Sequence, residues 1–149
     1  MKKIVIFDLD GTIALIDHRR HFVEGKGSKA TNEEWRCFFA ACVDDEPNEP
    51  VINTLRALRT HGYYIVILSG RSDEVAVETR IWLKDYDVPY DELHMRPEGN
   101  YEPDEKWKAR FLRRFDPATI LCVFDDRQKV VDMWRSHGLV CFQVAPGDF

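Results

Sequence analysis

The sequence predicts an α/β fold in which a doubly wound parallel sheet carries helices on both faces, with a small helical cap inserted near the start of the chain. Short apolar runs typical of buried strands alternate with longer segments whose apolar residues recur at helical spacing. Several of these runs end directly in polar residues, at the strand ends where open parallel sheets bind their ligands. With 149 residues, of which 44% are hydrophobic, the chain is expected to form a single domain, residues 1–149.

The first predicted element is a buried strand at Ile4–Phe7, a run of consecutive apolar residues. It is followed by Asp8-Leu9-Asp10-Gly11-Thr12, in which two carboxylates flank one leucine before a tight Gly-Thr turn. A single aspartate at a strand end would be a weak signal, whereas this pattern directly after a buried strand is much more specific. We therefore expect any chemistry of the protein to be centred on Asp8 and Asp10.

Residues 17–50 interrupt the alternation of strands and helices. A helix capped by Thr31 or Asn32 carries an apolar stripe that consists of Trp35, Phe38, Phe39 and Cys42. We interpret residues 17–50 as a small cap over the strand ends, and an ordinary core helix is the alternative. The acidic run that follows, Asp44-Asp45-Glu46, is interpreted as a solvated loop. His18 and His21 are interpreted as surface residues rather than metal ligands.

The middle of the chain predicts a helix, a strand and a second helix. Apolar side chains at helical spacing within residues 51–58 predict a helix that stops at Gly62. Tyr63–Leu68 is rich in β-branched and aromatic residues and predicts a strand, which ends in Ser69-Gly70-Arg71-Ser72. A turn of this kind offers a hydroxyl and backbone N–H groups to an anion. In the helix after it, the residues expected to face the core are Val75, Val77, Ile81 and Trp82.

The last part of the chain continues the same alternation. Leu93–Met95 is a short strand candidate that leads to Arg96. A helix opens at Pro103-Asp104, and its apolar positions are Trp107, Phe111 and Leu112. Ile120–Phe124 predicts a buried strand that ends in Asp125-Asp126. The remaining elements are a helix marked by Val130, Val131 and Trp134 that ends at Gly138, and a closing strand at Leu139–Val144.

The polar residues at these strand ends suit phosphoryl transfer. The set consists of Asp8, Asp10, Ser69, a lysine at position 106 or 108, Asp125 and Asp126. One carboxylate can act as a nucleophile and another can transfer a proton, while a hydroxyl and a cation hold phosphate oxygens. Four acids in one crevice would repel each other unless a divalent cation neutralises them, which predicts Mg²⁺. The alternative is that these aspartates only cap helices and solvate strand ends.

Composition limits the other possibilities. The 21 Lys and Arg against 26 Asp and Glu give a net charge of −5, so any basic surface for nucleic acid must be local. The apolar run before Asp8 is too short for a signal peptide, and no run reaches membrane-spanning length, so we expect a cytoplasmic protein that does not bind membranes. The 4 cysteines show no ligand-like spacing, which favours reduced thiols over zinc.

The motifs carry a resemblance to a known family. Asp8-Leu9-Asp10-Gly11-Thr12 is similar to the first motif of the haloacid dehalogenase-like phosphatases, whose fold is a Rossmann-like sheet. The segments Leu68–Arg71, Phe124–Arg127, Val131–Arg135 and Gln143–Phe149 resemble, more narrowly, the 3′-phosphatase domain of bacteriophage polynucleotide kinase. The similarity runs over essentially the whole chain, as if that domain stood alone without a kinase half.

The resemblance implies a role for each site residue. It implies that Asp8 is the nucleophile and Asp10 the general acid/base, and that Ser69 binds the phosphoryl group. The family spacing Asp-x-x-x-Lys favours Lys108 as the catalytic lysine, with Lys106 still open. The expected metal ligands are Asp8, Asp10, Asp125 and Asp126. The expected substrate-binding residues are Thr12, Arg19, Gly70, Arg71 and Arg96. For Arg19 the alternative is a solvent-exposed side chain, and for Arg96 a salt bridge with Glu98 or Glu102.

The expected function is therefore that of a Mg²⁺-dependent phosphomonoesterase that works through an aspartyl-phosphate. The resemblance implies that it removes 3′-phosphates from polynucleotide ends, in the host cytoplasm if the chain is phage-encoded, and that a separate kinase or ligase is a possible partner. The rival substrate is a mononucleotide or another small phosphate ester. A non-catalytic phosphate-binding module is the third hypothesis.

Overall fold

A central sheet of five parallel strands organises the computed structural model, which describes residues 1–147. The order across the sheet is β5-β4-β1-β6-β7. The strands are β1 (Ile4–Phe7), β4 (Tyr64–Ser72), β5 (Glu92–Arg96), β6 (Ile120–Asp125) and β7 (Cys141–Gln143). Each neighbouring pair is parallel, so all carboxyl ends lie at one edge. Asp148 and Phe149 of the terminal motif lie outside the described residues.

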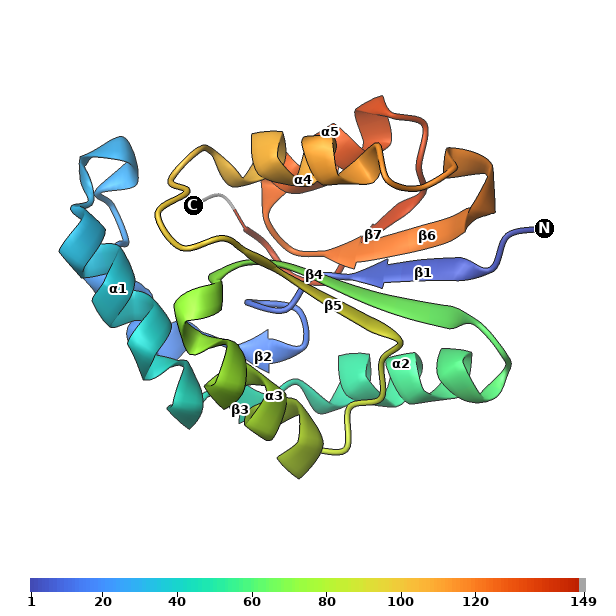
Figure 1. Ribbon diagram of the computed structural model, residues 1–149, viewed down its shortest axis with the longest axis horizontal. Helices are drawn as coiled ribbons and strands as arrows, with labels where there is room; N and C mark the ends of the chain where they lie inside the picture. The colour runs from blue at the N-terminus through green and yellow to red at the C-terminus, as the bar shows by residue number, and fades with distance from the viewer. Residues whose placement is uncertain (148–149) are drawn as a thin grey trace.

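Helices cover both faces of this sheet. Figure 1 shows α2 (Glu49–Thr60) and α3 (Ala76–Asp85) on one face, and α4 (Asp104–Leu112) and α5 (Gln128–Ser136) on the other. The predicted doubly wound α/β fold is confirmed.

Successive residues of each central strand point into two different cores. In β1, Val5 and Phe7 pack with the α2 and α3 side, whereas Ile6 packs with Trp107 and Trp134 on the α4 and α5 side. Both faces of the strand are buried, which is why the sequence shows a continuous apolar run rather than an alternation.

The segment between β1 and α2 lies beyond the carboxyl ends of the strands (Figure 1). It contains a two-stranded antiparallel pair, β2 (Ala14–Leu15) with β3 (Glu46–Pro47). Between these strands lie the helix α1 (Asn32–Ala40) and the 3₁₀ turns η1 (Asp17–Phe22), η2 (Gly27–Lys29) and η3 (Ala41–Asp44). Its small core is built from Ile16, Phe38 and Phe39. That it acts as a cap stays a prediction.

The start of α1 follows from local sequence. The Thr31 hydroxyl accepts a hydrogen bond from the Glu34 backbone N–H, and the Glu34 carboxylate accepts one from the Thr31 backbone N–H. This reciprocal arrangement satisfies two backbone donors that a helix start leaves unpaired.

One predicted helix face is wrong in part: Trp82 is buried as expected, but two other residues are not. Val77 and Ile81 were expected to face the core, but they are 65% and 54% exposed. The chain first forms a 3₁₀ turn, η4 (Asp73–Val75), so that α3 begins only at Ala76. The face of α3 that is buried therefore consists of Thr79, Trp82 and Leu83.

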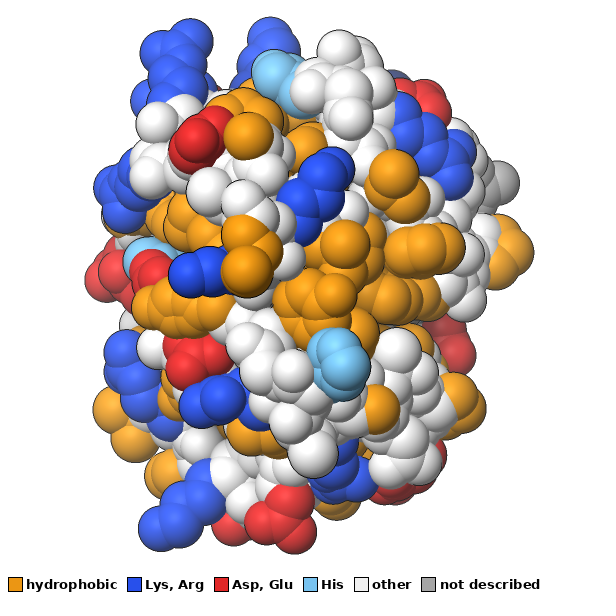
Figure 2. All heavy atoms as spheres, turned by 90° about the vertical axis from the view of Figure 1, so that its right-hand side faces the viewer, with side chains coloured by type: hydrophobic (Ala, Val, Ile, Leu, Met, Phe, Trp, Pro, Cys, Tyr) orange, Lys and Arg blue, Asp and Glu red, His pale blue; other side chains and the backbone are white. Residues whose placement is uncertain are grey.

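Figure 2 shows the opposite end of the molecule, where the strands begin. Apolar side chains gather across the middle of this face, with acidic and basic side chains around them. No helix in the described part of the chain is long and apolar enough to cross a membrane.

Candidate active site

The ends of β1 and β6 bring two aspartates to one lysine. Lys108 Nζ, on α4, lies 2.7 Å from Asp8 Oδ1 and 3.1 Å from Asp125 Oδ2. Lys108 is fully buried, whereas Lys106 is exposed, so Lys108 is the lysine that enters the site. Burial alone would lower the pKa of Lys108, but Asp104, Asp125 and Asp8 outweigh it and raise that pKa well above its usual value.

The Asp8 carboxylate is fixed on both oxygens. Thr12 Oγ1 donates to Asp8 Oδ2 over 3.0 Å, while Lys108 holds the other oxygen. Burial, followed by the negative charge of Asp125, raises the pKa of Asp8 well above its usual range. The Thr12 hydroxyl thus contacts the predicted nucleophile, and the predicted contact of Thr12 with substrate stays a prediction.

Three aspartates form a group that could hold a metal ion. One carboxylate oxygen from each of Asp8, Asp125 and Asp126 lies within 4.8 Å of the others, and all three residues are buried. Burial, followed by the charge of Asp125, raises the pKa of Asp126 to about 7. Hard oxygen ligands of this kind suit Mg²⁺. The side chain of Asp10, a fourth predicted ligand, is not part of this group.

Asp10 lies against two buried arginines. Its Oδ1 accepts from Arg19 Nη2 at 2.7 Å, and from Arg71 Nη2 at 2.5 Å and Nε at 3.1 Å. Burial would raise the pKa of Asp10, but the charges of Arg19 and Arg71 outweigh it and hold that pKa well below its usual range. Asp10 is therefore ionised in the resting site.

Asp45 accepts hydrogen bonds from the same two arginines. Its carboxylate accepts from Arg19 Nε and Nη2, each at 2.8 Å, and from Arg71 Nη2 at 3.2 Å, and His18 Nε2 lies 2.7 Å from it. The Asp45 side chain is fully buried. The interpretation of run 44–46 as a solvated loop is therefore wrong at Asp45, although Asp44 and Glu46 are exposed.

Both arginines were predicted to bind substrate. The alternative that Arg19 is solvent-exposed is wrong, because Arg19 is fully buried and also donates to the Phe38 carbonyl at 3.1 Å. Arg71 is 1% exposed and also donates to the Thr79 hydroxyl at 3.0 Å. Both guanidinium groups thus serve protein acceptors, and their contact with substrate stays a prediction.

The end of β4 forms the next wall of the site. Ser69 is buried, and its Oγ accepts a hydrogen bond from the Arg71 backbone N–H at 3.0 Å. Arg96, at the end of β5, donates to the Gly70 carbonyl at 3.0 Å and to Asp104 Oδ1 at 2.7 Å. The carboxylate partner of Arg96 is therefore Asp104, while Glu102, one of the two expected partners, offers its backbone carbonyl.

Gly70 is sterically required. A Cβ at this position would lie 2.2 Å from Asp104 Oδ1 and 3.2 Å from Arg96 Nη2. We expect Gly70→Ala to displace Asp104 from Arg96 and Lys108, at a cost of roughly 1–3 kcal/mol in stability and with at least about a tenfold loss of activity. Thermal unfolding together with kcat/KM would test this, and unchanged values of both would contradict it.

Two further glycines leave the space into which Asp126 packs. Gly11 has a φ of +84°, and a Cβ there would lie 2.0 Å from Asp126 Oδ2. A Cβ on Gly147 would lie 2.3 Å from the Asp126 carbonyl oxygen. The adjacent Asp125 is held by Trp134, whose indole N–H donates to Oδ2 at 3.1 Å. The terminal motif and the helix after β6 thus support the acidic pair.

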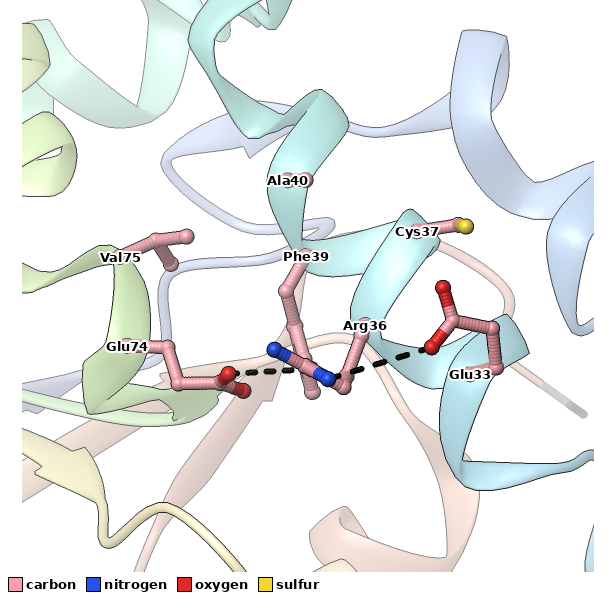
Figure 3. Close-up of a pocket in the computed structure, with 7 residues that line it drawn as sticks. All are labelled: Glu33, Arg36, Cys37, Phe39, Ala40, Glu74 and Val75. Carbon is pink, nitrogen blue, oxygen red and sulfur yellow. Dashed lines mark hydrogen bonds and ion pairs between the residues drawn. The ribbon is translucent and has the colours of Figure 1, made fainter.

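A separate pocket of about 370 Å³ lies where α1 meets η4. Figure 3 shows Arg36 between Glu74 and Glu33, at 3.1 Å and 3.9 Å respectively. The Arg36–Glu74 pair connects α1 to η4, whereas the Arg36–Glu33 pair lies within α1. None of the predicted site residues lines this pocket.

Sequence reasoning missed three residues of the site: Asp45, Asp104 as the partner of Arg96, and Trp134 as the partner of Asp125. The only available signal was indirect. Buried arginines need carboxylate partners, so predicting Arg19 and Arg71 in the site also predicts further acids near them. The sequence does not show which acids these are.

Comparison with known proteins places the chain in a family. The family model described as "Polynucleotide kinase PNKP phosphatase domain" matches residues 2–149. A protein of Autographa californica nuclear polyhedrosis virus, named "Putative bifunctional polynucleotide kinase/RNA ligase", is 31% identical over an alignment of 137 residues that covers 89% of this chain and 18% of that protein.

Solved structures agree with this assignment. Two Pnkp1/Rnl/Hen1 complexes, one described as an RNA repair complex, contain a chain similar to all of this one, at 32% and 33% identity and TM-scores of 0.82 and 0.83. This chain spans 48% and 44% of those chains. The L-2-haloacid dehalogenase of Xanthobacter autotrophicus shares the fold, with 13% identity, a TM-score of 0.64, and coverage of 97% of this chain and 78% of that one. The chain therefore belongs to the polynucleotide kinase PNKP phosphatase domain family, among the haloacid dehalogenase-like phosphatases.

Proposed function

We propose that this chain is a Mg²⁺-dependent phosphomonoesterase that removes 3′-phosphates from nucleic-acid ends. The observation that carries the proposal is the position of Asp8, which contacts the Lys108 ammonium and is itself part of the group formed with Asp125 and Asp126. A carboxylate next to a fixed cation and within a cluster suited to a divalent metal can approach a phosphate dianion without prohibitive repulsion.

In the first step, an Asp8 oxygen attacks phosphorus in line, the new O–P bond forms and the ester P–O bond breaks. Lys108 and Ser69 hold the non-bridging oxygens as charge develops on them. Mg²⁺ bound by Asp8, Asp125 and Asp126 would neutralise phosphate charge and act as a Lewis acid. Asp10 gives its proton to the leaving oxygen, so that an alcohol departs and an aspartyl-phosphate remains.

Asp10 needs a proton before this step, although Arg19 and Arg71 favour its ionised form. The negative charge of the bound phosphate raises the pKa of Asp10 and lets it take up the proton that it then donates. In the second step, the ionised Asp10 accepts a proton from water, which attacks phosphorus and releases Asp8. Arg19 and Arg71 keep the Asp10 carboxylate oriented in both steps.

The substrate class and partners are proposed from the relatives. Their names combine polynucleotide kinase, RNA ligase and RNA repair, and this chain spans less than half of each of them. We propose that the domain works beside a kinase or ligase activity on nucleic-acid ends.

The decisive experiment measures phosphate release, with Mg²⁺ and with EDTA, from three substrates. These are an oligonucleotide with a 3′-phosphate, the matching 3′-mononucleotide and a 5′-phosphorylated oligonucleotide. We expect Mg²⁺-dependent release that strongly favours the 3′-phosphorylated strand, with a KM that rises steeply with salt because several phosphates shed counterions. EDTA should abolish the release.

Other outcomes would change the assignment. Equal or better turnover of the mononucleotide, with shallow salt dependence, would move the function to small phosphate esters. Absence of release from all three substrates would favour the non-catalytic phosphate-binding module.

A further inference from the structure

We propose that a cavity beside the active site binds a nucleobase of the strand that leads to the 3′-phosphate. The inference rests on the proposed function and adds to it a reason why a polynucleotide would be preferred over a mononucleotide. The cavity has a volume of about 280 Å³, close to the lower end of small-ligand sites, roughly 300–1,000 Å³. The lining residues that matter are His94, Asn100, Trp107, Arg110, Phe111 and Arg114.

Aromatic rings form one side of the cavity. The Phe111 ring lies 4.4 Å from His94 and 6.0 Å from Trp107, measured between ring centroids. The Arg114 guanidinium lies over the Phe111 ring at 4.7 Å. Bases of single strands are bound by stacking on such rings and on guanidinium planes.

The cavity adjoins the catalytic residues through a short chain of contacts. Lys108 Nζ lies 3.6 Å from Asp104 Oδ2, and Arg96 Nη2 lies 2.7 Å from Asp104 Oδ1. The Arg96 guanidinium is in turn 5.6 Å from the centroid of the Trp107 ring, which lines the cavity. A strand with its terminal phosphate at Asp8 could therefore place an upstream base here.

The charges favour a base in the cavity and a phosphate at its rim. Arg110 and Asn100 both donate to Glu102, so the charge of Arg110 is largely neutralised. Arg114 has no carboxylate within ion-pair distance in residues 1–147 and is exposed.

The segment that lines the cavity is rich in basic side chains, although the chain as a whole carries a net negative charge. α4 and the residues after it present exposed cations at Lys106, Arg113 and Arg114, in addition to Arg110, which is paired with Glu102. The net charge of −5 therefore does not prevent this side of the molecule from attracting a phosphate backbone.

The test compares the double variant Arg110→Gln, Arg114→Gln with the control Arg80→Gln, which changes an exposed arginine of α3 on the opposite face of the sheet. We expect the ratio of kcat/KM for the 3′-phosphorylated oligonucleotide to that for the mononucleotide to fall roughly tenfold in the double variant only. With the unaltered protein, an oligonucleotide that carries one abasic nucleotide should have a KM raised roughly tenfold when the missing base is the one that occupies the cavity. With that oligonucleotide, the double variant should raise KM little further.

Two results would overturn the proposal. One is an equal change in kcat/KM for both substrates in the double variant, and the other is a KM that no abasic position raises. Fluorescence anisotropy with the Asp8→Asn protein measures binding of the same oligonucleotides without turnover. Failure of the phosphatase assignment would be seen separately, as absence of phosphate release from every substrate by the unaltered chain.

Discussion

Asp8→Asn is expected to lower phosphate release by on the order of 10⁴-fold or more, because a carboxamide cannot form the acyl phosphate. The fold should survive. Asparagine has nearly the same shape, and removing the Asp8 charge relieves its repulsion with Asp125. Lys108 keeps Asp104 and Asp125 as partners. The measurements are kcat with Mg²⁺ on the 3′-phosphorylated oligonucleotide and the thermal unfolding midpoint.

Asp85→Asn provides the matched control. Asp85 is exposed at the end of α3, so the same chemical change there should leave both activity and stability unaltered. If Asp8→Asn protein with a native unfolding midpoint retained activity within about tenfold of this control, the nucleophile assignment would be lost.

The strand ends of this site could be predicted because their signals are local. An apolar run that stops at Asp8 or at Asp125 marks both a buried strand and the edge where ligands bind. Lys108 could be favoured over Lys106 because the family spacing Asp-x-x-x-Lys, counted from Asp104, selects it. Such inferences need only a few neighbouring residues.

What could not be predicted depends on distant parts of the chain. Asp45 is 26 residues from both Arg19 and Arg71, and nothing near it distinguishes it from its exposed neighbours Asp44 and Glu46. The rotation of α3 depends on whether the chain enters it through a 3₁₀ turn, which Val77 and its neighbours do not reveal.

Asp45→Asn is expected to have the second large effect, although Asp45 touches none of the metal-site carboxylates. Its charge is the buried counterpart of both Arg19 and Arg71. Breaking a buried ion pair from one side typically costs roughly 3–5 kcal/mol, and here Asp10 alone would remain to balance two buried guanidinium charges. The arginines would then shift away from their present positions, and Asp10 would lose the contacts that orient it. We expect kcat to fall by about a hundredfold or more.

Asp44, the residue next to Asp45, provides the matched control. Asp44→Asn changes an exposed carboxylate one position away, and should alter neither the free energy of unfolding in urea nor kcat. The activity of the Asp45→Asn protein should be measured well below its own unfolding midpoint, so that loss of rate reports on the folded site. Because Asp10 transfers the proton, the loss should be smaller for a substrate whose leaving group needs no protonation, such as a nitrophenyl phosphate. An equal loss on both substrates would show that Asp45 supports the fold around the site rather than the orientation of Asp10.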